Sequence, residues 1–279
     1  MDLVIQAPSI AQDALAAIVS LVDAQGIAVL DGGGQQAYRL SRVRTEDGVA
    51  LLCASAGIDH ALVPPDLTRA RVGLVAIDMD STLITIECID EIADMLGIKT
   101  EVATITAATM RGDIDFRESL TRRVALLAGL PVAALARVYD ERLALSPGAE
   151  RMLAGFRAAG AKTLLVSGGF TYFTDRLKER LGFDDAVANT LLVQEGRLTG
   201  AVAEPVIDAR EKASRLAAMR ARHVKPGGIV VAIGDGANDL PMLRQADVSI
   251  AYHANPVVRA QARYAINHCG LDAALNLFA

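Results

Sequence analysis

From residue 73 onward, short apolar runs alternate with segments whose apolar residues recur at helical spacing. The apolar runs are GLVAID, AKTLLVS, GGIVVAIGD, DVSIAY and RYAIN. Runs that are apolar at nearly every position are typical of parallel strands buried on both faces. The amphipathic segments between them include AERMLAGFRAAG, FTDRLKERLG and AREKASRLAAMRAR. This alternation predicts an α/β fold with a doubly wound parallel sheet.

Residues 88–145 interrupt the alternation, because they contain helix-like stretches and no convincing strand. They follow the first predicted strand of the sheet. We therefore expect a helical cap inserted over the carboxyl ends of the strands, where open α/β sheets bind ligands. Further along, LLVQEGRLTGAV carries Glu195-Gly196 between alternating apolar positions, which predicts a hairpin added to the parallel sheet.

The first 62 residues have a different pattern, which predicts a small α+β unit. LVIQA, IAVLD, AYRLSRV and VALLCAS are predicted as strands, and SIAQDALAAIVSLVDAQG as a helix. Residues 63–71 contain two consecutive prolines and are predicted as a linker. The expected domains are an N-terminal α+β domain over 1–70, an α/β core over 71–87 and 146–279, and the cap over 88–145.

Composition and charge argue against nucleic acid and membranes as partners of the chain. Of its 279 residues 52% are hydrophobic, and 28 basic against 33 acidic side chains give a net charge of −5. The chain therefore has no global positive field for nucleic acid or an anionic membrane. Its apolar runs are far shorter than the ~18–20 residues of a membrane-spanning helix. Three scattered cysteines and an acidic residue at position 2 are expected of a cytoplasmic protein.

Carboxylates end two of the apolar runs. Asp78 and Asp80 end the first run, in VAIDMDSTL, and residues i and i+2 of an extended chain point to the same side. Both could therefore address one reacting centre, although Asp side chains also cap turns. Another run, VVAIG, is followed by Asp235 and Asp239. Oxygen-rich side chains without His or Cys favour a hard cation, with Mg²⁺ expected over a structural Ca²⁺ loop.

A third apolar run ends in Ser167 and Gly168, within VSGG. Exposed backbone N–H groups and one hydroxyl could cradle a phosphate there. By itself, however, SGG is more often an ordinary strand-to-helix turn. The chain has neither the GxGxxG fingerprint nor a P-loop motif, so dinucleotide-binding and P-loop functions lose their main support.

Together these motifs resemble a known superfamily. DMDST, SGG, a lysine in EKAS and GDGANDLPM are similar to the four motifs of the haloacid dehalogenase superfamily, and within it to those of the phosphoserine phosphatases. The motifs span about residues 73–250, and the first 70 residues resemble an ACT-like regulatory extension loosely. The resemblance implies a Mg²⁺-dependent phosphomonoesterase that hydrolyses O-phosphoserine through an aspartyl phosphate, as the last step of serine biosynthesis. It also allows a homodimer.

The resemblance assigns roles to the acids and to one lysine. Asp78 would be the nucleophile and Asp80 the general acid and base. Lys212 would neutralise charge at the phosphoryl group, whereas its place in an amphipathic helix alone would make it a solvated residue. Mg²⁺ would be held by Asp78, by the backbone carbonyl of Asp80 and by Asp235, with Asp239 in support.

Substrate contacts follow from the same resemblance. Glu87 and Arg123 would recognise the ammonium and the carboxylate of the substrate. Met110 and Phe116 would close over it, although packing within the cap is an equally good explanation for both. The residues that would bind the phosphate are Ser167, Gly168 and Asn238.

Two other kinds of protein remain open from the residues. A related phosphatase or phosphotransferase acting on another small phosphate, such as phosphohomoserine, would carry the same motifs and differ at Glu87 and Arg123. A receiver-like signalling module also clusters acids at strand ends. Asp80 and the helical insertion oppose the signalling module, because Asp80 could promote hydrolysis of the phosphoenzyme and the insertion would enclose the site.

Overall fold

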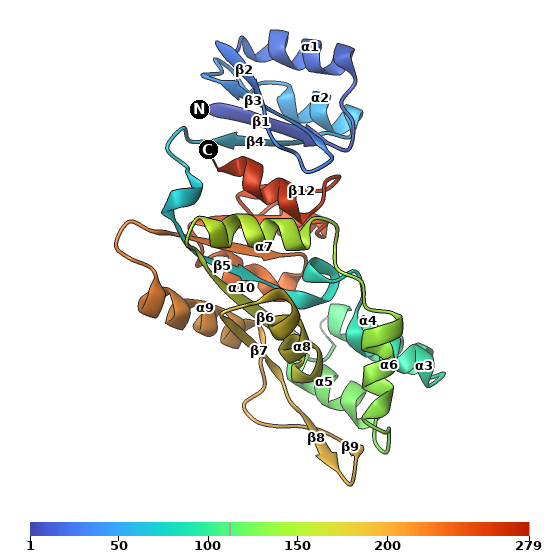
Figure 1. The fold of residues 1–279 in the computed structure, drawn as a ribbon. Coiled ribbons are helices and arrows are strands. Elements are labelled where there is room, and N and C mark those ends of the chain that lie inside the picture. Colours follow the sequence, from blue (N-terminus) through green and yellow to red (C-terminus); the bar gives the residue numbers. More distant parts are fainter. Residues whose placement is uncertain (112, 279) are drawn as a thin grey trace.

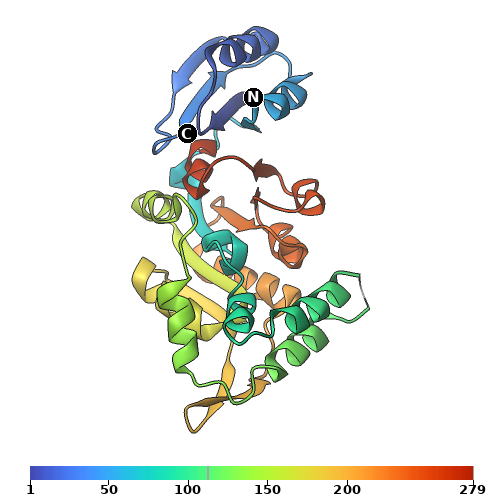
Figure 2. The ribbon, with the colours of Figure 1, turned by 90° about the vertical axis from the view of Figure 1, so that its right-hand side faces the viewer.

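The computed structural model describes residues 1–111 and 113–278, and the side chains at positions 110 and 111 lie outside that description. Figure 1 shows three layers along the long axis of the molecule: an N-terminal unit at one end, a parallel sheet in the middle, and inserted helices with a hairpin at the other end. The two ends of the chain lie close together beside the N-terminal unit, as the view in Figure 2 also shows.

A six-stranded sheet forms the centre of the protein. Its strand order is β12-β11-β10-β5-β6-β7, and every neighbouring pair is parallel. The predicted parallel sheet is thus confirmed, although β7 was not predicted. The strands are β5 (Val72–Ile77), β6 (Lys162–Phe170), β7 (Asp185–Asn189), β10 (Ile229–Gly234), β11 (Val248–Tyr252) and β12 (Tyr264–Ile266).

Helices cover both faces of this sheet. On one face Leu74 and Val230 pack in a core cluster with residues of α9 and α10. On the other face Val75 and Ile233 pack with residues of α7, α8 and the 3₁₀ segment η4. Apolar side chains on both faces of the same strands explain why those runs read as continuously hydrophobic. The covering segments are α7 (Ala149–Ala158), α8 (Thr171–Leu181), α9 (Ala209–His223), α10 (Leu240–Leu243), α11 (Pro256–Arg259) and η4 (Leu271–Leu277).

The insertion after β5 is helical, as predicted. Residues 88–145 contribute no named strand in the part of the chain that the structure describes. The helix α4, which is rich in threonine, was not predicted individually, because its apolar periodicity is weak. The four helices are α3 (Cys88–Met95), α4 (Lys99–Arg111), α5 (Phe116–Ala125) and α6 (Ala133–Glu141).

The hairpin over residues 191–202 exists, but its predicted attachment to the parallel sheet is wrong. The strands β8 (Leu191–Gln194) and β9 (Arg197–Val202) form a separate two-stranded sheet. The hairpin forms hydrogen bonds with the insertion instead. The N–H of Gly129 donates to Leu198 O, and the N–H of Leu198 donates to Leu130 O, both at 2.8 Å. These contacts hold the hairpin beneath the inserted helices in Figure 1, where it continues the chain beyond the end of β7.

The N-terminal unit is a four-stranded antiparallel sheet with the order β2-β3-β1-β4. Its elements follow one another as a split βαβ arrangement, with both helices on one face of the sheet (Figure 1). The elements are β1 (Asp2–Ala7), α1 (Gln12–Val22), β2 (Gly26–Val29), β3 (Gln36–Ser41), α2 (Val49–Ala56) and β4 (Asp59–Val63), and the 3₁₀ turn η1 (Arg69–Arg71) leads into β5.

Residues 49–55, predicted as a strand, form the helix α2 instead. Gly48 and Gly57 flank it with left-handed φ angles of 79° and 65°, and the N–H of Gly57 bonds to Cys53 O and Ala54 O. Such a glycine ends a helix without steric cost. The run VALLCASA is also poor in β-branched residues, and a short apolar run alone does not distinguish helix from strand. The fourth strand is β4, which lies between the predicted strand and the predicted linker, where no element was expected, and reaches the linker only at Val63.

The second face of the N-terminal sheet packs on the end of the chain. Val4 of β1 belongs to the same core cluster as Leu277 of η4. The Asp59 carboxylate, which is 2% exposed, accepts three backbone N–H groups after β12, from Asn267 at 2.7 Å and from His268 and Cys269 at 3.0 Å. The N-terminal unit therefore completes the hydrogen bonding of the segment that follows β12.

We predict that Asp59→Ala lowers the free energy of unfolding by about 3 kcal/mol, because three backbone N–H groups, including that of the buried Cys269, lose the same charged acceptor. Urea unfolding followed by circular dichroism measures this change. The control is Asp66→Ala, which removes an exposed ion pair with Arg71 and should change the free energy by less than about 0.5 kcal/mol. Equal small effects in both variants would contradict the structural role of Asp59.

Candidate active site

Acids from two distant parts of the sequence converge at the carboxyl edge of the central sheet. Asp78 follows β5 and Asp235 follows β10, and these two strands are direct neighbours. One carboxylate oxygen from each of Asp78, Asp235 and Asp239 lies within 4.8 Å of the others. The convergence that the sequence predicted is therefore present in the structure.

Lys212 joins two of these acids. It projects from α9, is 1% exposed, and its Nζ lies 2.8 Å from Asp78 Oδ1 and 2.8 Å from Asp239 Oδ1. The alternative interpretation of this lysine as a solvated helix residue is thus wrong. Burial alone would lower the pKa of Lys212, but the carboxylates of Asp239 and Asp78 more than offset that effect and raise it. Lys212 therefore stays protonated.

One lysine does not balance the negative charge of the cluster. Burial, and then the nearby Asp239 carboxylate, raise the pKa of Asp78 well above its ordinary value in spite of Lys212. Burial raises the pKa of Asp235 to about 6. Carboxylates crowded in this way are stabilised by an added cation. An all-oxygen donor set fits a small divalent ion such as Mg²⁺.

The turn after β5 positions Asp80 away from the acid cluster. Asp80 Oδ1 accepts the backbone N–H of Cys88 at 2.9 Å, and Oδ2 accepts the Ser167 hydroxyl at 3.3 Å. A contribution of Asp80 to a metal would therefore come from its backbone carbonyl. Burial also raises the pKa of Asp80, against the hydrogen bond from Cys88. A raised pKa suits a group that must donate a proton.

The segment after Val166 approaches Asp80 closely. A Cβ atom on Gly169 would lie 2.6 Å from Asp80 Oδ2, so only glycine allows this approach. The Gly169 N–H donates to Ser167 Oγ at 2.8 Å. Asn189 at the end of β7 supports the loop, because its Nδ2 donates to Gly168 O at 2.8 Å. The sequence analysis missed Asn189 because it missed β7, and an amide at the end of DAVAN was the available signal.

Three of the predicted specificity residues face the site from the cap side. Glu87 Oε1 accepts the Ser81 hydroxyl at 2.7 Å, and burial and the Asp80 charge raise the pKa of Glu87 to about 7. Arg123 lies close enough to Asp90, Glu87 and Asp80 to feel their charges, while burial lowers its pKa. It has no ion pair within 4.0 Å in the described residues. Phe116 reaches across to the core, where its Cζ would lie 3.1 Å from a Cβ on Gly168.

Two further predicted residues are less directly placed. Asn238 lies in the short turn Ala237–Asp239, where its Oδ1 folds over Gly236. In the part of the chain described, its side chain forms no hydrogen bond with Ser167 or Gly168. Met110 lies near the end of α4, and its side chain falls outside the described residues. The roles predicted for both remain predictions.

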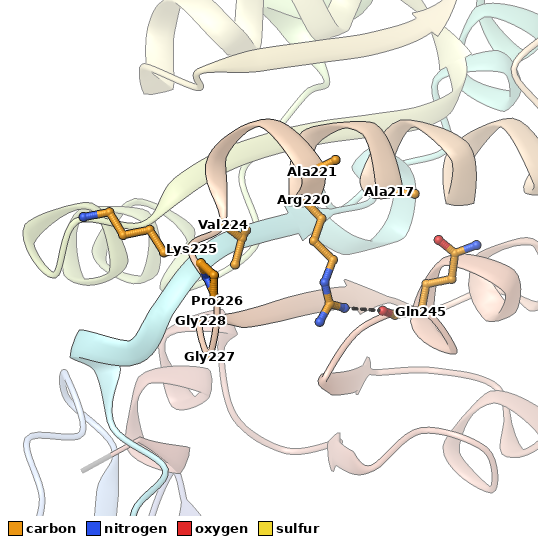
Figure 3. A pocket seen from close by; sticks show the side chains of 9 residues that line it. All are labelled: Ala217, Arg220, Ala221, Val224, Lys225, Pro226, Gly227, Gly228 and Gln245. Atoms are coloured by element: carbon orange, nitrogen blue, oxygen red, sulfur yellow. Dashed lines mark hydrogen bonds between the residues drawn. The ribbon is translucent and has the colours of Figure 1, made fainter.

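A hollow of about 540 Å³ lies at the opposite edge of the sheet, between the end of α9 and Pro226–Gly228 (Figure 3). Arg220 points into it from α9 and donates to Gln245 O at 3.0 Å. None of the acids of the site lines this hollow. It borders Gly228, next to the start of β10, whereas the acids lie at the ends of the strands, so the hollow is separate from the candidate active site.

The fold and the acid cluster are those of a known class of enzymes, which similarity to protein families identifies. The family model of the haloacid dehalogenase-like hydrolases matches residues 75–244. The chain belongs to this family of hydrolases, as its motifs predicted.

No helix among the described residues is long and apolar enough to cross a membrane.

Within the family, the chain is similar to phosphoserine phosphatases. It is 49% identical over 228 residues to the phosphoserine phosphatase of Polaromonas sp., covering 80% of this chain and 97% of the relative. A probable phosphoserine phosphatase from Vibrio cholerae, solved without ligand, has a TM-score of 0.83 at 35% identity over 99% of this chain and 85% of that one. A substrate-bound phosphoserine phosphatase has a TM-score of 0.68 at 35% identity over 75% of this chain and 99% of that chain.

We predict that Mg²⁺ raises the melting temperature more at about pH 7.5 than at about pH 5. The pKa of Asp235 in the folded, metal-free protein is about 6, above its ordinary value of 3.8. Protonation of Asp235 therefore stabilises the metal-free fold at low pH, and this stabilisation is lost as the pH rises through 6. Differential scanning fluorimetry measures the shift.

The same experiment on Asp235→Asn serves as the control. This variant lacks the Asp235 carboxylate, so the difference between the Mg²⁺-dependent shifts at the two pH values should become smaller. A Mg²⁺-dependent shift of the same size at both pH values in the unaltered protein would contradict the assignment of Asp235 to the cation site.

Proposed function

We propose that this chain is a Mg²⁺-dependent phosphoserine phosphatase, which hydrolyses O-phosphoserine to serine and phosphate through an aspartyl-phosphate intermediate. The observation that carries the proposal is the pairing of two acids from one turn. Asp78 is held by a buried lysine beside further carboxylates, while Asp80 is turned toward the phosphate-binding candidates. A nucleophile and a proton donor two residues apart are what a two-step phosphoryl transfer needs.

Asp78 is oriented for nucleophilic attack. Its Oδ1 is bound by Lys212 Nζ at 2.8 Å and by the N–H of Met79 at 2.7 Å. The other oxygen forms no hydrogen bond among the described residues and is available to form a bond to phosphorus. As that bond forms, the bond from phosphorus to the serine oxygen breaks. Lys212 balances the negative charge that gathers beside it.

Asp80 manages the proton in both steps. In the first step its carboxyl group donates a proton to the departing serine oxygen. In the second step the resulting carboxylate accepts a proton from the water that attacks phosphorus, and the bond between Asp78 and phosphorus breaks to release phosphate. The raised pKa of Asp80 keeps part of the enzyme in the protonated form that the first step requires.

The carboxylates of Asp78 and Asp235 and the backbone carbonyl of Asp80 would hold Mg²⁺, with Asp239 supporting the site through Lys212. When bound, the ion offsets the repulsion between an anionic nucleophile and a dianionic phosphate ester. Ser167 and Gly168, with Asn238, would bind the oxygens of the phosphoryl group.

The charges on the cap side match the two ends of a phosphorylated amino acid. The guanidinium of Arg123 is a cation that has no ion pair within 4.0 Å in the described residues. A guanidinium binds a carboxylate well. Glu87 supplies an anion for the ammonium group. Phe116, and Met110 by resemblance, would cover the substrate. Such a pair of fixed charges favours phosphoserine over phosphate esters that lack either group.

The remaining assignments are part of the same proposal. Residues 1–70 would form an ACT-like domain, 71–87 and 146–279 the catalytic core, and 88–145 the cap. In support, 75% of this chain covers 99% of the substrate-bound phosphatase, and residues 1–70 are about a quarter of the chain. A cytoplasmic location and a homodimer complete the proposal, which places the reaction at the end of serine biosynthesis.

We predict that the purified protein releases phosphate from O-phosphoserine with Mg²⁺, and that activity disappears with EDTA and returns with added Mg²⁺. Asp78→Asn should lower kcat by at least about 10³-fold, because it removes the nucleophile but preserves size. A colorimetric phosphate assay on a panel that includes phosphohomoserine measures both effects. Faster release from another ester would reassign the substrate, and near-normal turnover by Asp78→Asn would exclude the aspartyl phosphate.

We predict that Arg123→Ala raises the KM for O-phosphoserine by about 10–100-fold, the loss expected for a charged hydrogen bond. The KM for phosphoethanolamine, which has no carboxylate, should change much less. The matched control is Arg122→Ala, since Arg122 forms an exposed pair with Glu118 on the same helix. Equal losses on both substrates would remove Arg123 from carboxylate recognition.

A further inference from the structure

Thr82 contacts the acid cluster from within the turn after β5. The turn covers Met79–Leu83, and Thr82 is 0% exposed. Its Oγ1 lies 2.7 Å from Asp235 Oδ1, across 153 positions of sequence. An ionised carboxylate can only accept, so the hydroxyl of Thr82 donates this hydrogen bond.

Asp235 contacts Thr82, whereas the two neighbouring acids contact a lysine. Asp78 and Asp239 are both bound by Lys212 at 2.8 Å. Asp235 has no ion pair within 4.0 Å to any lysine or arginine of the described residues. The hydroxyl of Thr82 is therefore the neighbouring side-chain group that fixes the direction of this carboxylate.

The backbone around Thr82 is held firmly enough to fix that hydroxyl. Leu83 N donates to Asp78 O at 3.2 Å, and Ile84 N donates to Met79 O at 3.0 Å. Ser146 N, from the segment before α7, donates to Leu83 O at 2.9 Å. The turn is thus tied both to itself and to the core, so the position of Thr82 Oγ1 does not depend on a bound ligand.

We propose that Thr82 is a positioning residue for the divalent cation, whose hydroxyl holds one oxygen of Asp235 and leaves the other available as a metal ligand. The inference rests on the proposed function, because it requires the cation site. Outer partners that orient metal ligands contribute about 10–100-fold to metal affinity in proteins. Thr82 acts through Asp235 and does not itself touch the substrate.

The test compares Thr82→Val with Thr82→Ser. Valine has nearly the same shape but no hydroxyl, whereas serine keeps the hydroxyl. Isothermal titration of the protein with MgCl₂, in the absence of substrate, gives the dissociation constant for Mg²⁺. Thr82→Val should weaken Mg²⁺ binding by about 10–100-fold, while Thr82→Ser should stay within about threefold of the unaltered protein.

Thr163→Val is the matched control. Thr163 is also 0% exposed, and its Oγ1 donates to Asp184 Oδ2 at 3.1 Å. It lies at the amino end of β6, at the edge of the sheet opposite the acids. Thr163→Val therefore also removes a hydroxyl that donates to a carboxylate, but at a distance from the cation site. It should lower the melting temperature and leave the affinity for Mg²⁺ unchanged.

Two results would overturn the inference. One is a Thr82→Val protein that binds Mg²⁺ as tightly as the unaltered protein, and the other is a Thr82→Ser protein as weak as Thr82→Val, which would assign the effect to packing. Circular dichroism checks folding, and Thr82→Ala replaces Thr82→Val with the same expectation if the valine variant does not fold. Failure of the unaltered protein to bind Mg²⁺ would instead reject the proposed function, and with it this inference.

Discussion

The site depends on the ion pairs that Lys212 makes inside the protein with Asp78 and Asp239. A buried ammonium is stable only beside negative charge, and the two carboxylates provide it. With Asp235 included and all three acids ionised, one lysine leaves two negative charges uncompensated, and one divalent cation would balance them. The folded protein thus has excess negative charge at this site, and a metal ion would neutralise it. Burial of these groups and affinity for the ion are two consequences of one arrangement.

The sequence predicted those parts of the fold and site that depend on local pattern. Strands such as β5 and β10 were found because they are apolar on both faces, and Asp78 and Asp235 because they end those strands. Lys212 could not be placed in the same way. An amphipathic helix with many charges looks the same whether one lysine faces solvent or a buried acid, and only tertiary packing decides. The prediction of a strand over residues 49–55 was wrong for a related reason, because short apolar runs fit helix and strand equally well.

The ten residues from Asp78 to Glu87 concentrate most of the chemistry in one short segment. Asp80 is bound by the first N–H of α3, Ser81 bonds to Glu87, and Thr82 bonds to Asp235. Ser81 adopts a left-handed φ of 55°, which most side chains avoid. The segment therefore ties the proposed nucleophile, the proposed proton donor and a proposed specificity residue to a single backbone course. A substitution that relaxes this course would disturb all of them together.

The contact of Asp59 with the residues after β12 bears on how such proteins diversify. Three main-chain donors of the core are matched by a side chain that the N-terminal unit supplies. Exchange of that unit between lineages by recombination would leave these donors unmatched unless the last dozen or so residues moved with it. The beginning and the end of this chain are consequently expected to be inherited as a pair, and a shorter phosphatase without the unit must finish its own C-terminal segment differently.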